Sequence, residues 1–204
     1  MLVEDWMQPK VIAVRRDDSP ETARALLAKH RIRQLPVLQR GRLAGIVTDR
    51  DLRAAPAGTA RVDDVMTHQP HTTAPNELVD SAAHLMRHWK INSLPVLTGN
   101  KLVGILTTSD VLDAFVAFSG VSQPSYRMVV LPSAGSSTRE VRRIIEHHRA
   151  EVRWTHARGR GTSRKIDVRL VTKDIGAIED ALQAAGHSIS LVVMSTNPQP
   201  LRKK

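Results

Sequence analysis

The chain of 204 residues contains no cysteine, few aromatic residues and no long apolar run. Without cysteine it can form neither a disulfide nor a thiolate metal site, which fits a reducing compartment. Aromatic residues make up 3% of a chain that is 41% hydrophobic, so an aliphatic core is expected. No run approaches the ~18 apolar residues of a membrane-spanning helix, and the N-terminus lacks the apolar centre of a secretory signal. We therefore expect a soluble, cytoplasmic protein.

The charge is uneven along the chain. Residues 1–120 hold 15 Lys and Arg against 13 Asp and Glu, a net charge of +2, whereas residues 121–204 hold 15 against 7, a net charge of +8. A basic excess favours anionic partners such as nucleic acids, phosphates or acidic proteins. The second half is therefore the candidate for such a partner, although it shows no helix-turn-helix, zinc-finger or RNA-binding aromatic signature.

One segment occurs twice, 59 residues apart and without a gap. The copies share a Leu-Pro-Val-Leu run, a Gly-Ile pair and a Thr-x-x-Asp pattern at the same offsets: Leu35–Leu38, Gly45-Ile46, Thr48 and Asp51, then Leu94–Leu97, Gly104-Ile105, Thr107 and Asp110. A fixed period of this length indicates two copies of one structural unit that pack together. Packing alone does not explain why both copies keep the polar Thr and Asp.

Both copies predict the same order of elements, within units that we expect to span residues 1–59 and 60–120. Ser19 before Pro20 is typical of an N-cap followed by proline at the first helical position. In the first repeat the expected elements are a strand at 11–14, a helix from Pro20, a hairpin of strands 35–38 and 43–47, and a helix opened by Thr48. In the second repeat they are a helix at 77–88, strands at 94–97 and 101–106, and a helix from Asp110.

The pattern changes after a Gly- and Pro-containing boundary at 119–125. The expected elements are a strand at 127–132, a helix at 138–148, strands at 151–155 and 165–171 about a basic loop at 158–161, a helix at 175–185 and a strand at 188–194. This βαββαβ order is the split arrangement of a ferredoxin-like domain. We expect that domain to span residues 126–196, with a basic tail at 197–204.

The Thr-x-x-Asp pattern has two interpretations. At a helix start, Thr with an acidic residue three positions later is close to a capping box, and Asp there suits the helix dipole. The same carboxylate could also accept hydrogen bonds from two ribose hydroxyls, while the Thr hydroxyl and the exposed helix amides could hold phosphate oxygens. Because one residue can cap an empty helix and bind when a ligand arrives, the pattern leaves both interpretations open.

Other candidate sites are weaker. His84 and His88 have a metal-compatible spacing but no accompanying carboxylate-and-histidine signature, so solvated or half-buried helix histidines are the better interpretation. No nucleophile-elbow pattern and no phosphate-binding Gly-Lys-Ser/Thr ending occurs. We expect no catalytic residue, no metal and no catalytic cofactor, and hence no enzyme.

The two repeats resemble cystathionine-β-synthase (CBS) domains, and the pair resembles a CBS-pair (Bateman) module over about residues 1–118. The residues that carry this are Ile32-x-x-Leu35-Pro36-Val37 with Gly45-Ile46-Val47-Thr48-x-x-Asp51, and Ile91-x-x-Leu94-Pro95-Val96 with Gly104-Ile105-Leu106-Thr107-x-x-Asp110. The βαββαβ order resembles an ACT-type domain, and the combination is similar to bacterial acetoin-utilisation CBS–ACT proteins. The resemblance implies a disc-shaped homodimer that binds adenosine ligands in clefts between the repeats and regulates another protein.

The resemblance also implies which residues form the two clefts. In one, Ile46, Thr48, Arg50 and Asp51 would face His71, Thr72, Asn92 and Ser93. In the other, Ile105, Thr107 and Asp110 would face Val11, Ile12, Arg33 and Gln34. Arg33 corresponds to Asn92 in the repeat, and arginine offers phosphate a fork of donors that asparagine lacks. The Asp110 cleft is therefore predicted to be the better anion site.

We thus expect an α/β (α+β) protein with tandem CBS domains followed by an ACT-like domain. It would be a non-catalytic sensor of AMP, ADP or ATP, with S-adenosylmethionine as a less favoured ligand. Occupancy of the clefts would be passed to the C-terminal domain or to a partner protein in signal transduction. The alternative is a nucleic-acid-binding regulator that acts through its basic C-terminal half.

Overall fold

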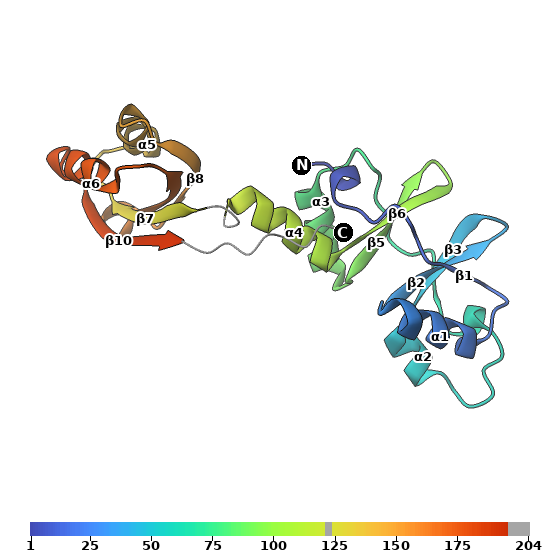
Figure 1. The fold of residues 1–204 in the computed structure, drawn as a ribbon. Helices are drawn as coiled ribbons and strands as arrows, with labels where there is room; N and C mark the ends of the chain where they lie inside the picture. The colour runs from blue at the N-terminus through green and yellow to red at the C-terminus, as the bar shows by residue number, and fades with distance from the viewer. Residues whose placement is uncertain (121–123, 196–204) are drawn as a thin grey trace. The chain divides into compact units, whose positions relative to one another are not determined.

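The computed structural model describes residues 1–120 and 124–195 and divides the chain into two compact units (Figure 1). The first unit is Met1–Ala114, and the second begins at Phe115. The centre of the predicted boundary, at 121–123, and the predicted basic tail, at 197–204, lie outside the described residues.

The first repeat contains the predicted hairpin and both predicted helices. Its elements are β1 (Val14–Arg15), α1 (Pro20–His30), β2 (Gln34–Gln39), β3 (Arg42–Thr48) and α2 (Asp49–Ala54). The predicted N-cap is confirmed, since the Ser19 side chain accepts a hydrogen bond from the Thr22 amide at 3.2 Å. The strand expected at 11–14 is shorter, because only Val14 and Arg15 pair with β2, in a parallel arrangement.

The second repeat follows the same order. Its elements are α3 (Val79–Trp89), β5 (Ser93–Thr98), β6 (Lys101–Thr107) and α4 (Thr108–Ser119), while the short strand β4 (Thr67–His68) pairs with β3 of the first repeat. Helix α3 begins two residues later than predicted, and Leu78 at its N-cap position makes no side-chain capping bond. In place of a first strand, Thr73 forms a parallel bridge with Val96, which matches the Val14–Val37 pair of the first repeat.

The two repeats exchange their first segments. Val3, at the start of the chain, is fully buried in the core of the second repeat, with Leu94 and Leu106. Val62 and Met66, the corresponding part of the second copy, pack in the core of the first repeat. Each repeat therefore completes its core with a segment that the sequence period assigns to the other.

This exchange explains the glycine of each Gly-Ile pair. The incoming segments run against β3 and β6, where Thr67 lies opposite Ile46 and Gln8 opposite Ile105. A Cβ at Gly45 would lie 2.5 Å from Met66 Sδ and 2.8 Å from the Thr67 carbonyl oxygen, and one at Gly104 would collide with Met7 Sδ. Both strands thus need glycine so that the exchanged segment can pack closely.

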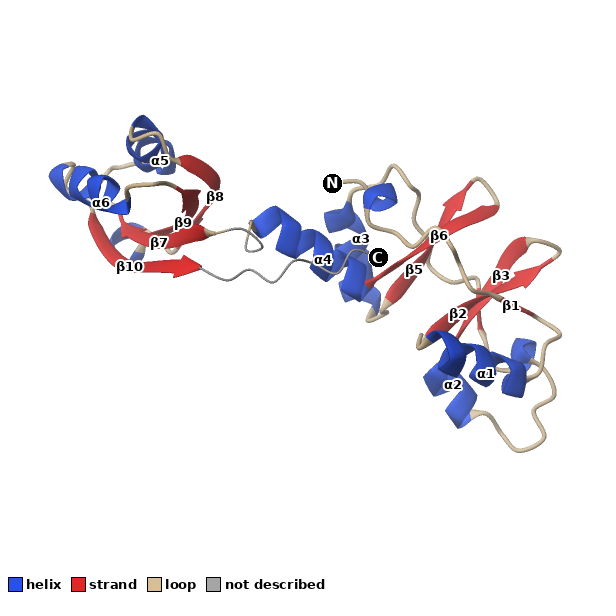
Figure 2. Ribbon diagram, in the orientation of Figure 1, coloured by secondary structure: helices blue, strands red, loops and turns tan. Residues whose placement is uncertain are grey.

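The second unit has the predicted βαββαβ order. Its elements are β7 (Ser125–Leu131), α5 (Thr138–His147), β8 (Glu151–Arg158), β9 (Lys165–Val171), α6 (Ile175–Ala184) and β10 (Ser188–Ser195). The strands form an antiparallel sheet in the order β10-β7-β9-β8. Figure 2 shows both helices on one side of this sheet, where buried aliphatic side chains form the core.

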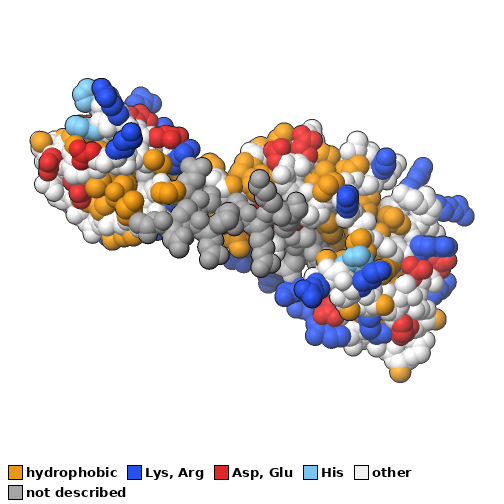
Figure 3. All heavy atoms as spheres, in the orientation of Figure 1, with side chains coloured by type: hydrophobic (Ala, Val, Ile, Leu, Met, Phe, Trp, Pro, Cys, Tyr) orange, Lys and Arg blue, Asp and Glu red, His pale blue; other side chains and the backbone are white. Residues whose placement is uncertain are grey.

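The first unit carries charges of both signs on its surface. Figure 3 shows Lys and Arg as well as Asp and Glu side chains on the face that it draws. Within residues 1–120 and 124–195, no helix has both the length and the apolar character needed to cross a membrane.

Candidate functional site

Helix α2 begins at a reciprocal set of hydrogen bonds between Thr48 and Asp51. Asp51 Oδ2 accepts from the Thr48 amide at 2.8 Å and from the Thr48 hydroxyl at 2.7 Å, while Thr48 Oγ1 accepts from the Asp51 amide at 3.3 Å. This is a capping box. Asp51 is half-buried, and its described contacts engage only Oδ2. The capping interpretation is confirmed here, and it leaves the second carboxylate oxygen available.

Helix α4 begins with the same geometry but carries an additional contact. Asp110 Oδ2 accepts from the Thr107 amide at 2.8 Å and from the Thr107 hydroxyl at 2.6 Å. Its other oxygen, Oδ1, accepts a hydrogen bond from Gln8 Nε2 at 2.8 Å. Asp110 is only 1% exposed. The oxygen that would accept a ligand hydroxyl in this repeat is therefore occupied by the protein's own side chain.

Gln8 was not identified from the sequence as a site residue. Its backbone exchanges hydrogen bonds with Ile105, at 2.8 and 3.0 Å, which places its side chain beside the start of α4. The corresponding position of the other copy, 59 residues later, is Thr67, which lies opposite Ile46. The threonine side chain is too short to reach the carboxylate at its helix start as Gln8 reaches Asp110. Comparing the two copies residue by residue shows glutamine in one and threonine in the other, but only the strand pairing shows that this position lies beside the helix start.

The hairpin register places four predicted site residues beside the Thr-x-x-Asp pattern of their own repeat. Gln34 lies opposite Thr48, and Ser93 lies opposite Thr107. The carbonyl of the preceding residue accepts a helix-start amide in each case: Arg33 from Asp49 at 2.9 Å, and Asn92 from Thr108 at 3.0 Å. The exposed Arg33 side chain thus belongs to the segment beside Asp51. Its predicted approach to Asp110 remains a prediction.

The remaining predicted residues are placed as follows. Val11 and Ile12 are half-buried ahead of β1, and Ile12 packs against the core of the first repeat. The His71 ring stacks on Trp89 of its own repeat, with ring centroids 4.4 Å apart. Thr72 is half-buried and Arg50 is exposed. No described contact joins either His71 or Thr72 to Asp51.

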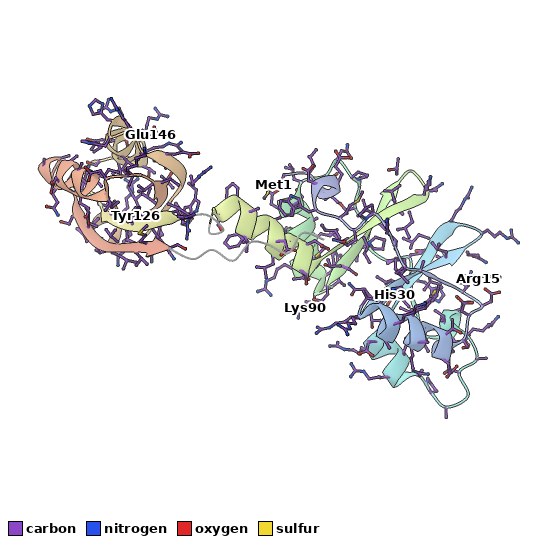
Figure 4. All side chains as sticks on the ribbon, viewed as in Figure 1. Met1, Arg15, His30, Lys90, Tyr126 and Glu146 are labelled. Carbon is purple, nitrogen blue, oxygen red and sulfur yellow. The ribbon has the colours of Figure 1, made fainter. Side chains whose placement is uncertain are left out.

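A groove lies between α3 and the start of α4 in the second repeat. Its volume is about 420 Å³, and it is lined by Ala83, Met86, Arg87, Lys90, Ile91, Asn92, Thr108 and Val111. Lys90 is labelled in Figure 4 at the end of α3. Of the predicted site residues, only Asn92 contributes to it. In the described parts of the chain, no three His, Cys, Asp or Glu side chains are grouped as metal ligands would be.

Comparison with known proteins identifies both repeats. A family model for the CBS domain matches residues 3–58 and 62–117. The inosine-5'-monophosphate dehydrogenase of Korarchaeum cryptofilum is 39% identical over 109 residues, which are 53% of this chain but only 23% of that protein. The chain thus spans less than a quarter of the length of that relative, and the match lies within the repeats.

Solved structures of CBS-domain proteins are similar to the same region. The CBS domain pair of protein MJ0100, in complex with 5'-methylthioadenosine and S-adenosyl-L-methionine, is 31% identical over 57% of this chain and 97% of that chain, with a TM-score of 0.55. CBSX2 in complex with AMP is 30% identical over 58% and 98%, with a TM-score of 0.55. An acetoin utilization protein of Vibrio cholerae is 29% identical over 59% and 94%, with a TM-score of 0.55.

Proposed function

Because the chain belongs to the CBS-domain family, we propose that it is a non-catalytic regulatory protein that binds an adenine nucleotide and transmits occupancy to its C-terminal unit or to a partner. The ligand would be AMP, ADP or ATP, with S-adenosylmethionine less favoured. Similar CBS pairs bind AMP, 5'-methylthioadenosine and S-adenosyl-L-methionine, which supports an adenosine ligand. A homodimer and a cytoplasmic location remain predictions from the sequence.

We further propose that the nucleotide binds at the start of α2. The observation that carries this is the difference between the two carboxylates: Asp51 keeps an oxygen outside its cap, whereas Gln8 takes the corresponding oxygen of Asp110. A ribose hydroxyl can donate to the available oxygen of Asp51. Arg33 and Arg50 are exposed on the adjoining segments and can supply guanidinium donors for phosphate. This reverses the ranking of the two clefts expected from the sequence.

We infer that the second unit is a ferredoxin-like domain of the ACT type. Its sheet order β10-β7-β9-β8 places the first and third strands at the centre, as the βαββαβ arrangement predicts. The family match ends at residue 117, so this assignment is supported by topology alone. An ACT-type domain at this place is consistent with the proposal that one chain joins nucleotide-binding repeats to a second regulatory unit.

Isothermal titration calorimetry with AMP, ADP, ATP and S-adenosylmethionine tests the proposal. We expect one nucleotide per chain. Asp51→Asn retains a capping acceptor but removes the charge, so it should weaken binding on the order of 10- to 100-fold, since a hydrogen bond to a charged group contributes ~1.5–3 kcal/mol. Asp110→Asn is the matched control and should leave affinity unchanged. Equal losses in both variants would contradict the assignment to Asp51, and the absence of any binding would contradict the proposed function.

A further inference from the structure

Helices α5 and α6 leave one face of the sheet of the second unit uncovered, and the end of α4 contacts part of that face, where Trp154 Nε1 donates to the Ser119 carbonyl at 3.0 Å. The core side chains of β7 and β9, such as Met128 and Val168, point toward α5 and α6. Side chains alternate along a strand, so Arg127, Asp167 and Arg169 share the opposite face. The strand register places further residues on that face: Trp154 and His156 on β8, and Leu191 and Val193 on β10. Figure 2 shows α5 and α6 on the same side of the sheet.

One carboxylate on this face is shared by two arginines. Asp167 Oδ1 accepts from Arg127 Nη2 at 3.0 Å, and Asp167 Oδ2 accepts from Arg158 Nε at 2.7 Å. The Asp167 side chain is only 3% exposed. Burial by itself would raise the pKa of Asp167, but the hydrogen bonds from Arg158 and Arg127 outweigh it and hold that pKa below its usual range. Both carboxylate oxygens are therefore engaged.

Arg169 lies on the same face, and it has no acidic partner among the residues that the structure describes. It is 8% exposed and directly opposite Arg127 in the sheet. Its Nη1 donates to the neutral Ser125 hydroxyl at 3.0 Å, while its Nε is buried without a hydrogen-bond partner. Across residues 1–120 and 124–195, no ion pair includes it. Burial, and then the charge of Arg127, lower the pKa of Arg169. A buried cation in this situation is costly unless an anion compensates it.

We propose that this face binds a small anion through a carboxylate or phosphate group that pairs with Arg169. Arg127 and Arg158 hold the anion from the sides, since each uses one nitrogen on Asp167 and a guanidinium carries five N–H donors. Their side chains are 49% and 53% exposed, so these donors are reachable. Planar guanidinium groups match carboxylate and phosphate in a two-bond geometry.

The neighbouring residues suit the rest of such a ligand. Leu191 and Val193 are 43% and 49% exposed on the adjoining edge strand and offer apolar contact. A purely structural role for Arg169 would make a different prediction, because the residue would then only donate to Ser125 and pack beside Gly120. In that case neutralising the side chain would change stability without changing any response to anions.

The test compares thermal unfolding and calorimetry of the full chain in inorganic phosphate, in succinate and in chloride of equal ionic strength. We expect phosphate or succinate, but not chloride, to raise the melting temperature, because a ligand of the folded state stabilises it. Arg169→Met should weaken binding of that anion on the order of 10- to 100-fold. Arg143→Met, on the exposed side of α5, is the matched control and should behave as the wild type.

Several outcomes would overturn the proposal. The first is an equal response to all three salts, and the second is an anion response that Arg169→Met leaves intact. The third is binding of single-stranded RNA by the wild type that is lost in Arg169→Met, which would indicate that this face binds nucleic acid instead. If Arg169→Met does not fold, Arg127→Gln replaces it, with an expected loss of about 10-fold. Nucleotide binding at Asp51 is measured in parallel and should survive in both variants, so this test does not depend on the proposed function.

Discussion

The two repeats have nearly the same backbone and the same capped helix start, yet they present different surfaces to a ligand. Asp51 is half-buried with one oxygen outside its cap, whereas Asp110 is 1% exposed and its corresponding oxygen accepts from Gln8. The difference originates in the exchanged segments, which place glutamine beside one helix start and threonine near the other. The duplicated units therefore share the geometry of the helix start, and we propose that one side chain, Gln8, decides whether a ligand can reach it.

The largest expected effect comes from exchanging these two side chains. Thr67→Gln should close the start of α2 and weaken nucleotide binding on the order of 10- to 100-fold, because the new amide would take the Asp51 oxygen. Gln8→Thr should open the start of α4 and raise the calorimetric stoichiometry from one nucleotide per chain to two. If Thr67→Gln kept its fold by circular dichroism and bound the nucleotide with unchanged affinity, the residue at this position would not explain the difference between the two repeats.

The glycines beneath the exchanged segments should respond alike in both repeats. Gly45→Ala and Gly104→Ala each bring a Cβ against a methionine sulfur and the adjoining backbone, so each should lower the free energy of unfolding by ~1–3 kcal/mol. Chemical denaturation measures this. Gly176→Ala, near the start of α6, is the control and should not destabilise, because a Cβ there would make only an ordinary van der Waals contact with Asp174 Oδ1 at 3.6 Å. If only one of the two Gly→Ala variants were destabilised, the exchanged segments would not pack equally closely against β3 and β6.

The first helix of each repeat offers a smaller contrast. Ser19 caps α1, whereas the corresponding Leu78 leaves α3 without a side-chain cap. Ser19→Ala should cost ~1 kcal/mol of stability, and Leu78→Ser should add up to ~1 kcal/mol, since a serine at this position accepts an otherwise unpaired amide. Leu78 is 46% exposed, so its replacement sacrifices little packing. Denaturation midpoints of the two variants should move in opposite directions.

The smallest effect concerns an ion pair that only one exchanged segment forms. Arg16 donates to both oxygens of Asp63 at 2.7 Å, and this hydrogen bonding is the main reason that the pKa of Asp63 lies below 3.8. A lowered pKa contributes stability at pH values above the unfolded-state pKa and loses it as pH falls through the folded-state value. Arg16→Met should therefore lower the melting temperature at pH 7 and converge with the wild type as the pH falls through the folded-state pKa of Asp63. A constant difference between the two proteins would contradict this.

Much of the local structure could be predicted from the sequence. The hairpin strands end within one or two residues of their predicted bounds, and the βαββαβ order of the second unit is confirmed. These elements depend on alternation, helical spacing and turn residues, which are properties of neighbouring positions. The errors lie at the ends of elements. Strand β1 is shorter because its length depends on how much of it pairs with β2. Helix α3 starts at Val79, two residues after its predicted start, with no side-chain cap to mark its beginning.

The candidate site could be predicted only in part. The Thr-x-x-Asp helix starts were found by their spacing, and both form the capping hydrogen bonds. From the sequence the Asp110 cleft was ranked first because of Arg33, whereas the opposite ranking that we propose depends on Gln8, a residue 102 positions from Asp110 along the chain. Arg169 was likewise not identified as a candidate from the sequence, because a functional role for a single arginine in a strand can be inferred only when its neighbours on the sheet are known.

By itself, the sequence determined that this protein contains two copies of one unit and a third region of different pattern, because repetition and periodicity are readable along a single chain. Only the tertiary structure decided which copy each initial segment completes, which carboxylate Gln8 covers, and that Arg169 is buried without an acidic partner among the described residues. Those outcomes depend on pairs of residues that are distant in sequence and close in space, and a side chain's chemistry is set by what lies within hydrogen-bonding distance of it.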